Sequence, residues 1–70
     1  MDFMYPNLCL ELKNNDISIK SLAVRLRMSE DSLCDKLRGE SPWLLPEVVD
    51  ICRLVNNSDV KFLFLQLDNN

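Results

Sequence analysis

The side chains that could carry out chemistry are few in this sequence, and their spacing fits no common reactive site. The chain has three cysteines and no histidine. Cys9, Cys34 and Cys52 do not form the Cys-x-x-Cys pairs of a zinc site. Histidine is the commonest general base, so its absence argues against catalysis. We expect reduced structural thiols, with a redox switch as the alternative, and no metal, cofactor or enzymatic activity.

Composition and charge describe the domain that must position any site. Of the 70 residues, 47% are hydrophobic and 27% are charged, which is typical of a globular chain. No apolar run approaches the roughly 20 residues that a membrane span needs, and no secretion signal is evident. We expect one soluble, cytosolic domain over residues 1–70, with no small-molecule ligand. The net charge of −3, from 8 basic and 11 acidic residues, argues against nucleic-acid binding.

The apolar periodicity predicts five short helices and an all-α bundle. Pro6 suits the first turn of a helix that ends at Asn14-Asn15-Asp16. Its expected inward residues are Leu8, Leu12 and, less regularly, Cys9.

The next two predicted helices are separated by a very short turn. Ser18 and Ser29 are their N-cap candidates, and Gly39 stands where a left-handed residue ends the second one. The expected inward residues are Ile19, Leu22, Ala23 and Leu26 in the first helix, and Leu33 and Leu37 in the second.

Two further helices are predicted after a loop that contains Pro42 and Trp43. Pro46 fits a first helical position, and the expected apolar stripe comprises Val48, Val49, Cys52 and Val55. Ser58 or Asp59 caps the last segment, Val60–Leu67, which is apolar on every side and is compatible with a helix or a strand. We expect Trp43 to cover the core.

The stretch ISIKSLAVRLRMSEDSLCDKLRG, which ends at Gly39, resembles the helix-turn-helix of the lambda-repressor-like (Cro/repressor) family. The matching features are Leu22-Ala23, Leu26-x-Met28, Ser29, and Leu33 with Leu37 before Gly39. Alanine is expected at position 23 because the second helix packs closely there. The segments SPWLLPEVVDI and SDVKFLF resemble the fourth and fifth helices of small phage members, so the likeness covers about residues 5–65. Arg27 differs, because the family usually has glycine there.

The resemblance implies a phage or prophage transcriptional regulator in a bacterial cytoplasm, whose unit at about 18–39 binds double-stranded DNA through the major groove. The base-facing candidates are Ser29, Glu30, Asp31, Ser32 and Asp35, and the phosphate-contacting candidates are Lys20, Lys36, Arg38 and Ser41. A homodimer is expected to bind two operator half-sites, with the segment at about 59–67 as the dimer element. Its candidate interface residues are Phe62, Phe64, Leu65 and Leu67.

Local charge both supports and opposes this interpretation. Residues 18–39 carry five basic and three acidic side chains, a net of +2, whereas the rest of the chain carries three and eight, a net of −5. Three acidic residues on the expected recognition helix are unusual, and Asp35 could instead pair with Arg38. The alternative is therefore a helix-turn-helix scaffold that binds another protein, such as an antirepressor or inhibitor. A third interpretation is a structural subunit of a phage complex.

Overall fold

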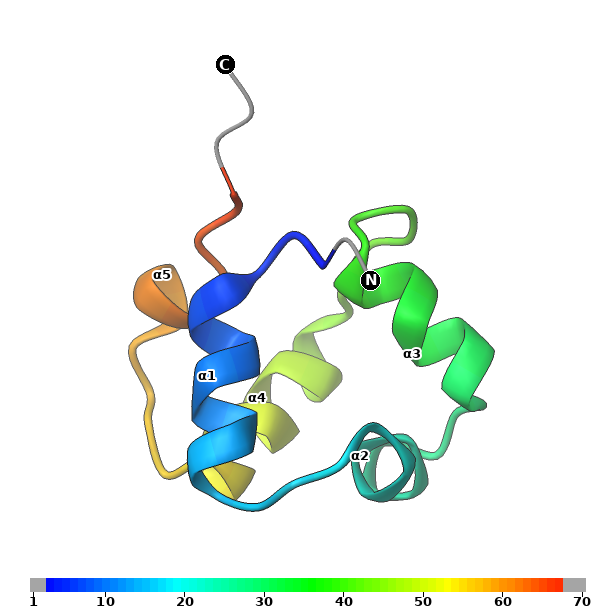
Figure 1. The fold of residues 1–70 in the computed structure, drawn as a ribbon, viewed down its shortest axis with the longest axis horizontal. Coiled ribbons are helices and arrows are strands. Elements are labelled where there is room, and N and C mark those ends of the chain that lie inside the picture. The colour runs from blue at the N-terminus through cyan, green and yellow to red at the C-terminus, as the bar shows by residue number, and fades with distance from the viewer. Residues whose placement is uncertain (1–2, 68–70) are drawn as a thin grey trace.

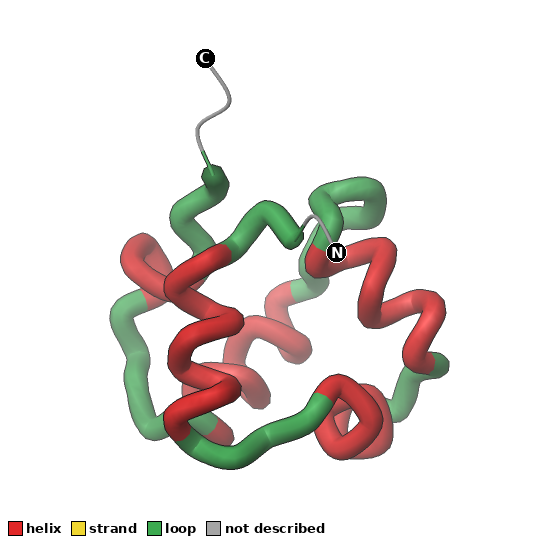
Figure 2. Tube along the Cα trace, viewed as in Figure 1, coloured by secondary structure: helices red, strands yellow, loops and turns green. Residues whose placement is uncertain are grey.

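The computed structural model describes residues 3–67, and within them every regular element is a helix (Figures 1 and 2). The helices are α1 (Pro6–Asn14), α2 (Ile19–Leu26), α3 (Glu30–Leu37), α4 (Leu45–Leu54) and α5 (Val60–Leu63). The predicted all-α class is confirmed. None of these helices is long and apolar enough to cross a membrane.

The helices surround one core, to which each of them contributes. Figure 1 shows α1 and α5 on one side, α2 and α3 on the other, and α4 between them. The fully buried side chains are Leu8, Leu22, Leu33, Leu37, Ile51 and Leu63. The inward positions predicted for the first three helices are confirmed for Leu8, Leu12, Leu22, Ala23, Leu26, Leu33 and Leu37, whereas Cys9 and Ile19 are half-buried.

Side-chain caps start three of the helices. The hydroxyl oxygens of Ser18 and Ser29 accept from the backbone N–H of Ser21 and Ser32, each at 3.1 Å. Asp59 caps α5 by accepting from the N–H of Phe62 at 3.1 Å. Each bond satisfies a backbone donor that the first helical turn leaves free. The two predicted serine caps are confirmed, and Asp59 is the cap of the last helix.

The fourth helix differs from its prediction in position and in its buried face. It begins at Leu45, so Pro46 is its second residue. Ile51 is fully buried and Val55 nearly so, whereas Val49 is 39% exposed. The predicted stripe was therefore wrong for Val49 and omitted Ile51. Apolar residues occupy more than half of this helix's circumference, so periodicity alone did not identify the face that the core uses.

The fifth helix is one turn long and ends before the predicted segment does. Regular structure stops at Leu63, and residues 64–67 form neither helix nor strand. Two contacts with residues near the amino-terminal end of the described chain hold residues 64–67 in place. The ring of Phe64 packs edge-on against Tyr5, with centroids 5.8 Å apart, and the N–H of Leu67 donates to the carbonyl of Met4 at 2.7 Å.

Met4 also connects this end of the chain to α3. Its own N–H donates to the carbonyl of Leu37 at 2.8 Å, at the last residue of α3. Gly39 follows with φ +79°, the left-handed conformation predicted for it. A Cβ at Gly39 would lie 3.2 Å from the Cγ of Met4, so glycine is favoured there by both its backbone conformation and the lack of space.

Candidate nucleic-acid interface

The turn between α2 and α3 is three residues long and is built on a left-handed arginine. Arg27 has φ 58° and ψ 44°, and the next N–H, that of Met28, donates to the carbonyl of Ala23 at 3.0 Å. A side chain in this conformation costs about 1–2 kcal/mol relative to a right-handed one. The backbone therefore explains why glycine would suit this position, and it shows that Arg27 adopts the left-handed conformation here. Ala23 is buried where α2 packs against α3.

The first turn of α3 is polar and faces solvent. Ser29, Glu30, Asp31 and Ser32 are all exposed. The hydroxyl of Ser29 also donates to that of Ser32 at 3.0 Å, so these two side chains stabilise the start of the helix. The carboxylates of Glu30 and Asp31 lie in the first turn, where negative charge is favoured by the helix dipole. All four predicted base-facing side chains at this end are thus accessible to solvent.

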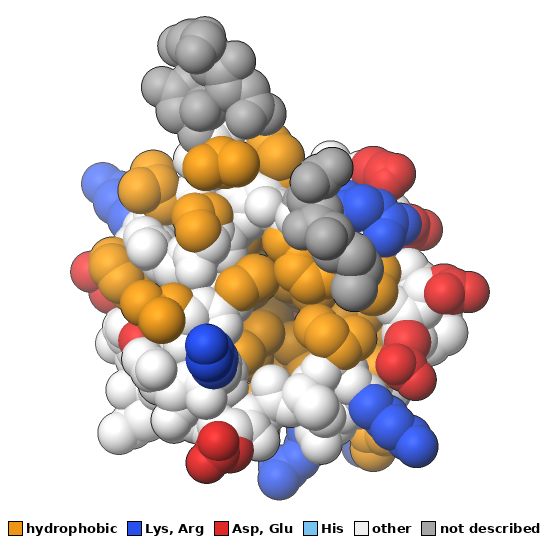
Figure 3. Space-filling model, viewed as in Figure 1, with side chains coloured by type: hydrophobic (Ala, Val, Ile, Leu, Met, Phe, Trp, Pro, Cys, Tyr) orange, Lys and Arg blue, Asp and Glu red, His pale blue; other side chains and the backbone are white. Residues whose placement is uncertain are grey.

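Asp35, the fifth base-facing candidate, lies one turn further along and forms an ion pair with Arg38. Arg38 also binds Glu40, with 3.0 Å between its Nε and a carboxylate oxygen. The hydrogen bond that Arg38 donates to Glu40, together with the negative charges of Glu40 and Asp35, raises the pKa of Arg38 above its ordinary value. Arg38 remains partly exposed, but its positive charge is paired with two carboxylates. Figure 3 shows acidic and basic side chains next to one another on the side of the molecule where α3 lies.

The predicted phosphate contact at Lys36 is contradicted by the position of its side chain. Its Nζ lies 2.6 Å from Glu47 of α4, and the two side chains are only 12% and 14% exposed. The same ammonium group lies 5.9 Å from the centre of the Trp43 ring. Glu47 also accepts from the N–H of Leu44 at 2.9 Å, so it caps α4 as well as pairing with Lys36. Lys36 therefore joins α3 to α4 instead of facing a ligand.

The remaining phosphate candidates are Lys20 and Ser41. Lys20 is exposed in the first turn of α2, and Ser41 is half-buried in the loop between α3 and α4. Sequence reasoning missed Glu47. The signal that was available is its place three residues after Leu44, the N3 position at which a glutamate commonly caps a helix.

The four predicted dimer residues occupy two different environments. Phe62, Leu65 and Leu67 are exposed, at 41%, 60% and 50%. Phe64 is half-buried, and its ring lies 5.4 Å from that of Trp43 in an edge-on contact. Phe64, Tyr5 and Trp43 form an aromatic cluster over the core. Trp43 covers the core as predicted, whereas Phe64 packs against aromatic rings of its own chain.

The thiols form no reactive constellation. All three cysteines are free and half-buried, and burial raises the pKa of Cys9 above its ordinary value. Residues 3–67 contain no group of three His, Cys, Asp or Glu side chains that could hold a metal ion.

Comparison with known proteins identifies no relative of this chain. No protein-family model matches the chain, and neither a curated protein nor a solved structure matches it.

Proposed function

We propose that the protein is a small sequence-specific DNA-binding regulator whose α3 lies in the major groove. The observation that carries this proposal is the α2–turn–α3 unit. Its two helices start at serine caps, and its turn holds Arg27 in the left-handed conformation. The exposed first turn of α3 then offers the hydroxyl proton of Ser32, which Ser29 does not use, to a base edge.

Contacts with the phosphate backbone of DNA would come from fewer cations than the sequence predicted. Lys36 forms an ion pair with Glu47, and Arg38 forms ion pairs with Asp35 and Glu40. Lys20 is the exposed, unshared candidate, because it is in none of the ion pairs among residues 3–67. We therefore expect weak non-specific binding, with affinity that depends on a small number of phosphate contacts.

The test is selection from a random duplex pool at low and at moderate salt. A regulator retains a defined sequence, and the logarithm of its affinity falls with the logarithm of salt concentration. Lys20→Ala should lower the salt slope by about 1 and weaken all sequences alike. Lys61→Ala is the matched control, because Lys61 is also exposed but lies on α5, away from α2 and α3 (Figure 1).

Asp35→Asn tests where the acidic face of α3 lies relative to DNA. The substitution removes one of the two carboxylates that accompany Arg38. If α3 approaches the phosphates, non-specific binding tightens. An affinity identical to that of the unmodified protein would place Asp35 away from the duplex.

A second candidate function is binding of a basic protein surface through α3. The observation that favours it is the pair of exposed carboxylates at Glu30 and Asp31. Neither takes part in the ion pairs found within residues 3–67. Failure to enrich any duplex at low salt would contradict DNA binding and favour this alternative.

A further inference from the structure

An apolar groove of about 500 Å³ lies between α4 and α5. Its apolar lining comprises Leu45, Val48, Val49 and Cys52 of α4 and Val60 of α5. Leu45 and Val49, one helical turn apart, form an exposed row, whereas Cys52 also packs against the core. Val60, on the other wall, is exposed as well. The groove is therefore an apolar surface that stays in contact with solvent.

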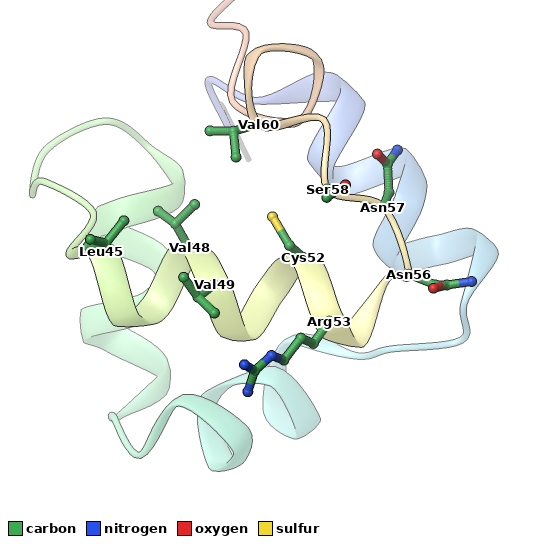
Figure 4. A pocket seen from close by; sticks show the side chains of 9 residues that line it. All are labelled: Leu45, Val48, Val49, Cys52, Arg53, Asn56, Asn57, Ser58 and Val60. Carbon is green, nitrogen blue, oxygen red and sulfur yellow. The ribbon is translucent and has the colours of Figure 1, made fainter.

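The two ends of the groove differ in polarity. Figure 4 shows Leu45 and the two valines along the first turns of α4, and three polar residues where the helix gives way to the loop before α5. These polar residues are Asn56, Asn57 and Ser58. The apolar part follows α4 from Leu45 to Cys52, which corresponds to about 10 Å along a helix. An apolar length with a polar end is suited to an elongated, amphipathic molecule.

The charge beside the polar end is positive. Arg53 is exposed, and it is the one charged residue among those that line the groove. It also lines a neighbouring hollow together with Arg25 of α2 and Asp50 of α4. None of these three side chains takes part in the ion pairs found within residues 3–67. Two guanidinium groups and one carboxylate leave a net positive charge at this border, so it favours an anion.

The size of the groove matches a small molecule better than a protein. Small-molecule sites commonly have volumes of about 300–1,000 Å³, whereas a stable protein interface takes about 20–30 residues from each partner. The groove has a volume within the first range, and only nine residues line it. A molecule with an apolar body and one anionic group therefore fits its volume, its lining and its charge.

We propose that the α4–α5 groove binds a free apolar carboxylate of the medium-chain fatty-acid class. The alkyl chain lies along Leu45 and Val49, and the carboxylate lies beside the guanidinium group of Arg53. A guanidinium group binds a carboxylate through charge-assisted hydrogen bonds, and burial of the alkyl chain supplies the rest of the affinity. The groove is formed by α4 and α5 and is tested without DNA, so a negative result leaves the proposed DNA binding unaffected.

The charge of the ligand provides the sharpest test. Octanoate, octanol and octylammonium share one alkyl chain, so NMR titrations of the ¹⁵N-labelled chain at neutral pH, below micelle-forming concentrations, isolate the effect of charge. Octanoate should shift the amide signals of Val48, Val49 and Val60, and it should bind about tenfold more tightly than octylammonium. Arg53→Glu should reverse this preference, because it replaces the cation at the border of the groove with an anion.

Lys13→Glu is the matched control for the charge reversal. Lys13 is also exposed, but it borders a different and smaller apolar hollow, between α1 and the start of α2. The variant should bind octanoate as the unmodified chain does. Val49→Ser should weaken binding severalfold, whereas Val24→Ser should not, because Val24 is an exposed valine of α2 outside the groove. Circular dichroism should show native helix content in all four variants.

Three results would overturn the proposal. Octanoate could leave the signals of the groove unchanged, or Lys13→Glu could reverse the preference while Arg53→Glu does not. Octanol could bind as tightly as octanoate, which would assign the groove to an uncharged apolar partner. Shifts of the same signals on raising the protein concentration alone would instead assign the groove to a second copy of the chain, and they would equally contradict the proposal.

Discussion

Helices α3 and α4 bury leucine and isoleucine in the same core, yet they present opposite chemistry to solvent. The exposed first turn of α3 contains Glu30, Asp31 and Ser32, whereas the exposed side of α4 contains Leu45 and Val49. One apolar face is enough to hold a helix in a domain of this size. Apart from Asp50 and Arg53, the exposed side of α4 is therefore apolar, whereas the exposed first turn of α3 is polar throughout and suited to a polar ligand.

The largest effect should separate the two faces of α4. Ile51→Ala removes a fully buried side chain and should lower the free energy of unfolding by about 2–5 kcal/mol. Val49→Ala, on the exposed face of the same helix, should cost less than about 0.5 kcal/mol. Urea unfolding followed by circular dichroism gives both values. Equal losses would mean that the row containing Val49 is part of the core.

A smaller effect should separate the two cations of α3. Lys36→Ala leaves Glu47 mostly buried without its partner, and it should cost about 1–3 kcal/mol. Arg38→Ala removes more exposed ion pairs and should cost under about 1 kcal/mol. Urea unfolding of both variants tests this order. If Lys36→Ala weakened DNA binding by as much as Lys20→Ala while stability was unchanged, the structural role of Lys36 would be wrong.

The two left-handed positions that flank α3, Arg27 at the end of α2 and Gly39 after α3, should respond oppositely to substitution. Arg27→Gly relieves a left-handed side-chain conformation and should stabilise the fold by up to about 1 kcal/mol. Gly39→Ala introduces such a conformation and also crowds Met4, so it should destabilise by at least about 1 kcal/mol. Thermal unfolding temperatures should move in opposite directions. A shift of the same sign in both variants would contradict the left-handed backbone at one of these positions.

The smallest effect on stability is expected at alkaline pH, and it arises from Cys9 in α1, outside α3 and α4. Burial raises the pKa of Cys9, so the folded chain keeps this thiol protonated to higher pH than the unfolded chain does. The resulting stability is fully present at neutral pH and is lost as the pH rises from the ordinary thiol range through the raised pKa. Cys9→Ala should therefore flatten the alkaline fall in unfolding free energy. An unchanged slope would assign that fall to other groups.

Local signals predicted α2 and α3 well. Serine caps, a left-handed glycine and one narrow apolar stripe each act within a few residues, so Ser18, Ser29 and Gly39 could be assigned from the sequence. The same signals did not resolve α4, because apolar residues on two sides leave the buried face undetermined until neighbouring helices are in place. The pairing of Lys36 with Glu47 spans a loop and depends on how α3 and α4 meet. The end of α5 is likewise determined by distant residues, through Tyr5 and Met4.

The two hydrogen bonds of Met4 have a practical consequence for rebuilding the chain. Its carbonyl holds Leu67, and its N–H holds the end of α3, so the chain's first and last described segments lie side by side. Domains whose ends are close tolerate a change in the order of their elements. A short glycine-rich linker from the carboxyl end to the amino end, with new ends opened in the loop between α3 and α4 beside the exposed Pro42, should yield a circularly permuted protein. Such a permutant would place the end of α3 beside a free terminus, where a fluorophore could report on its ligand.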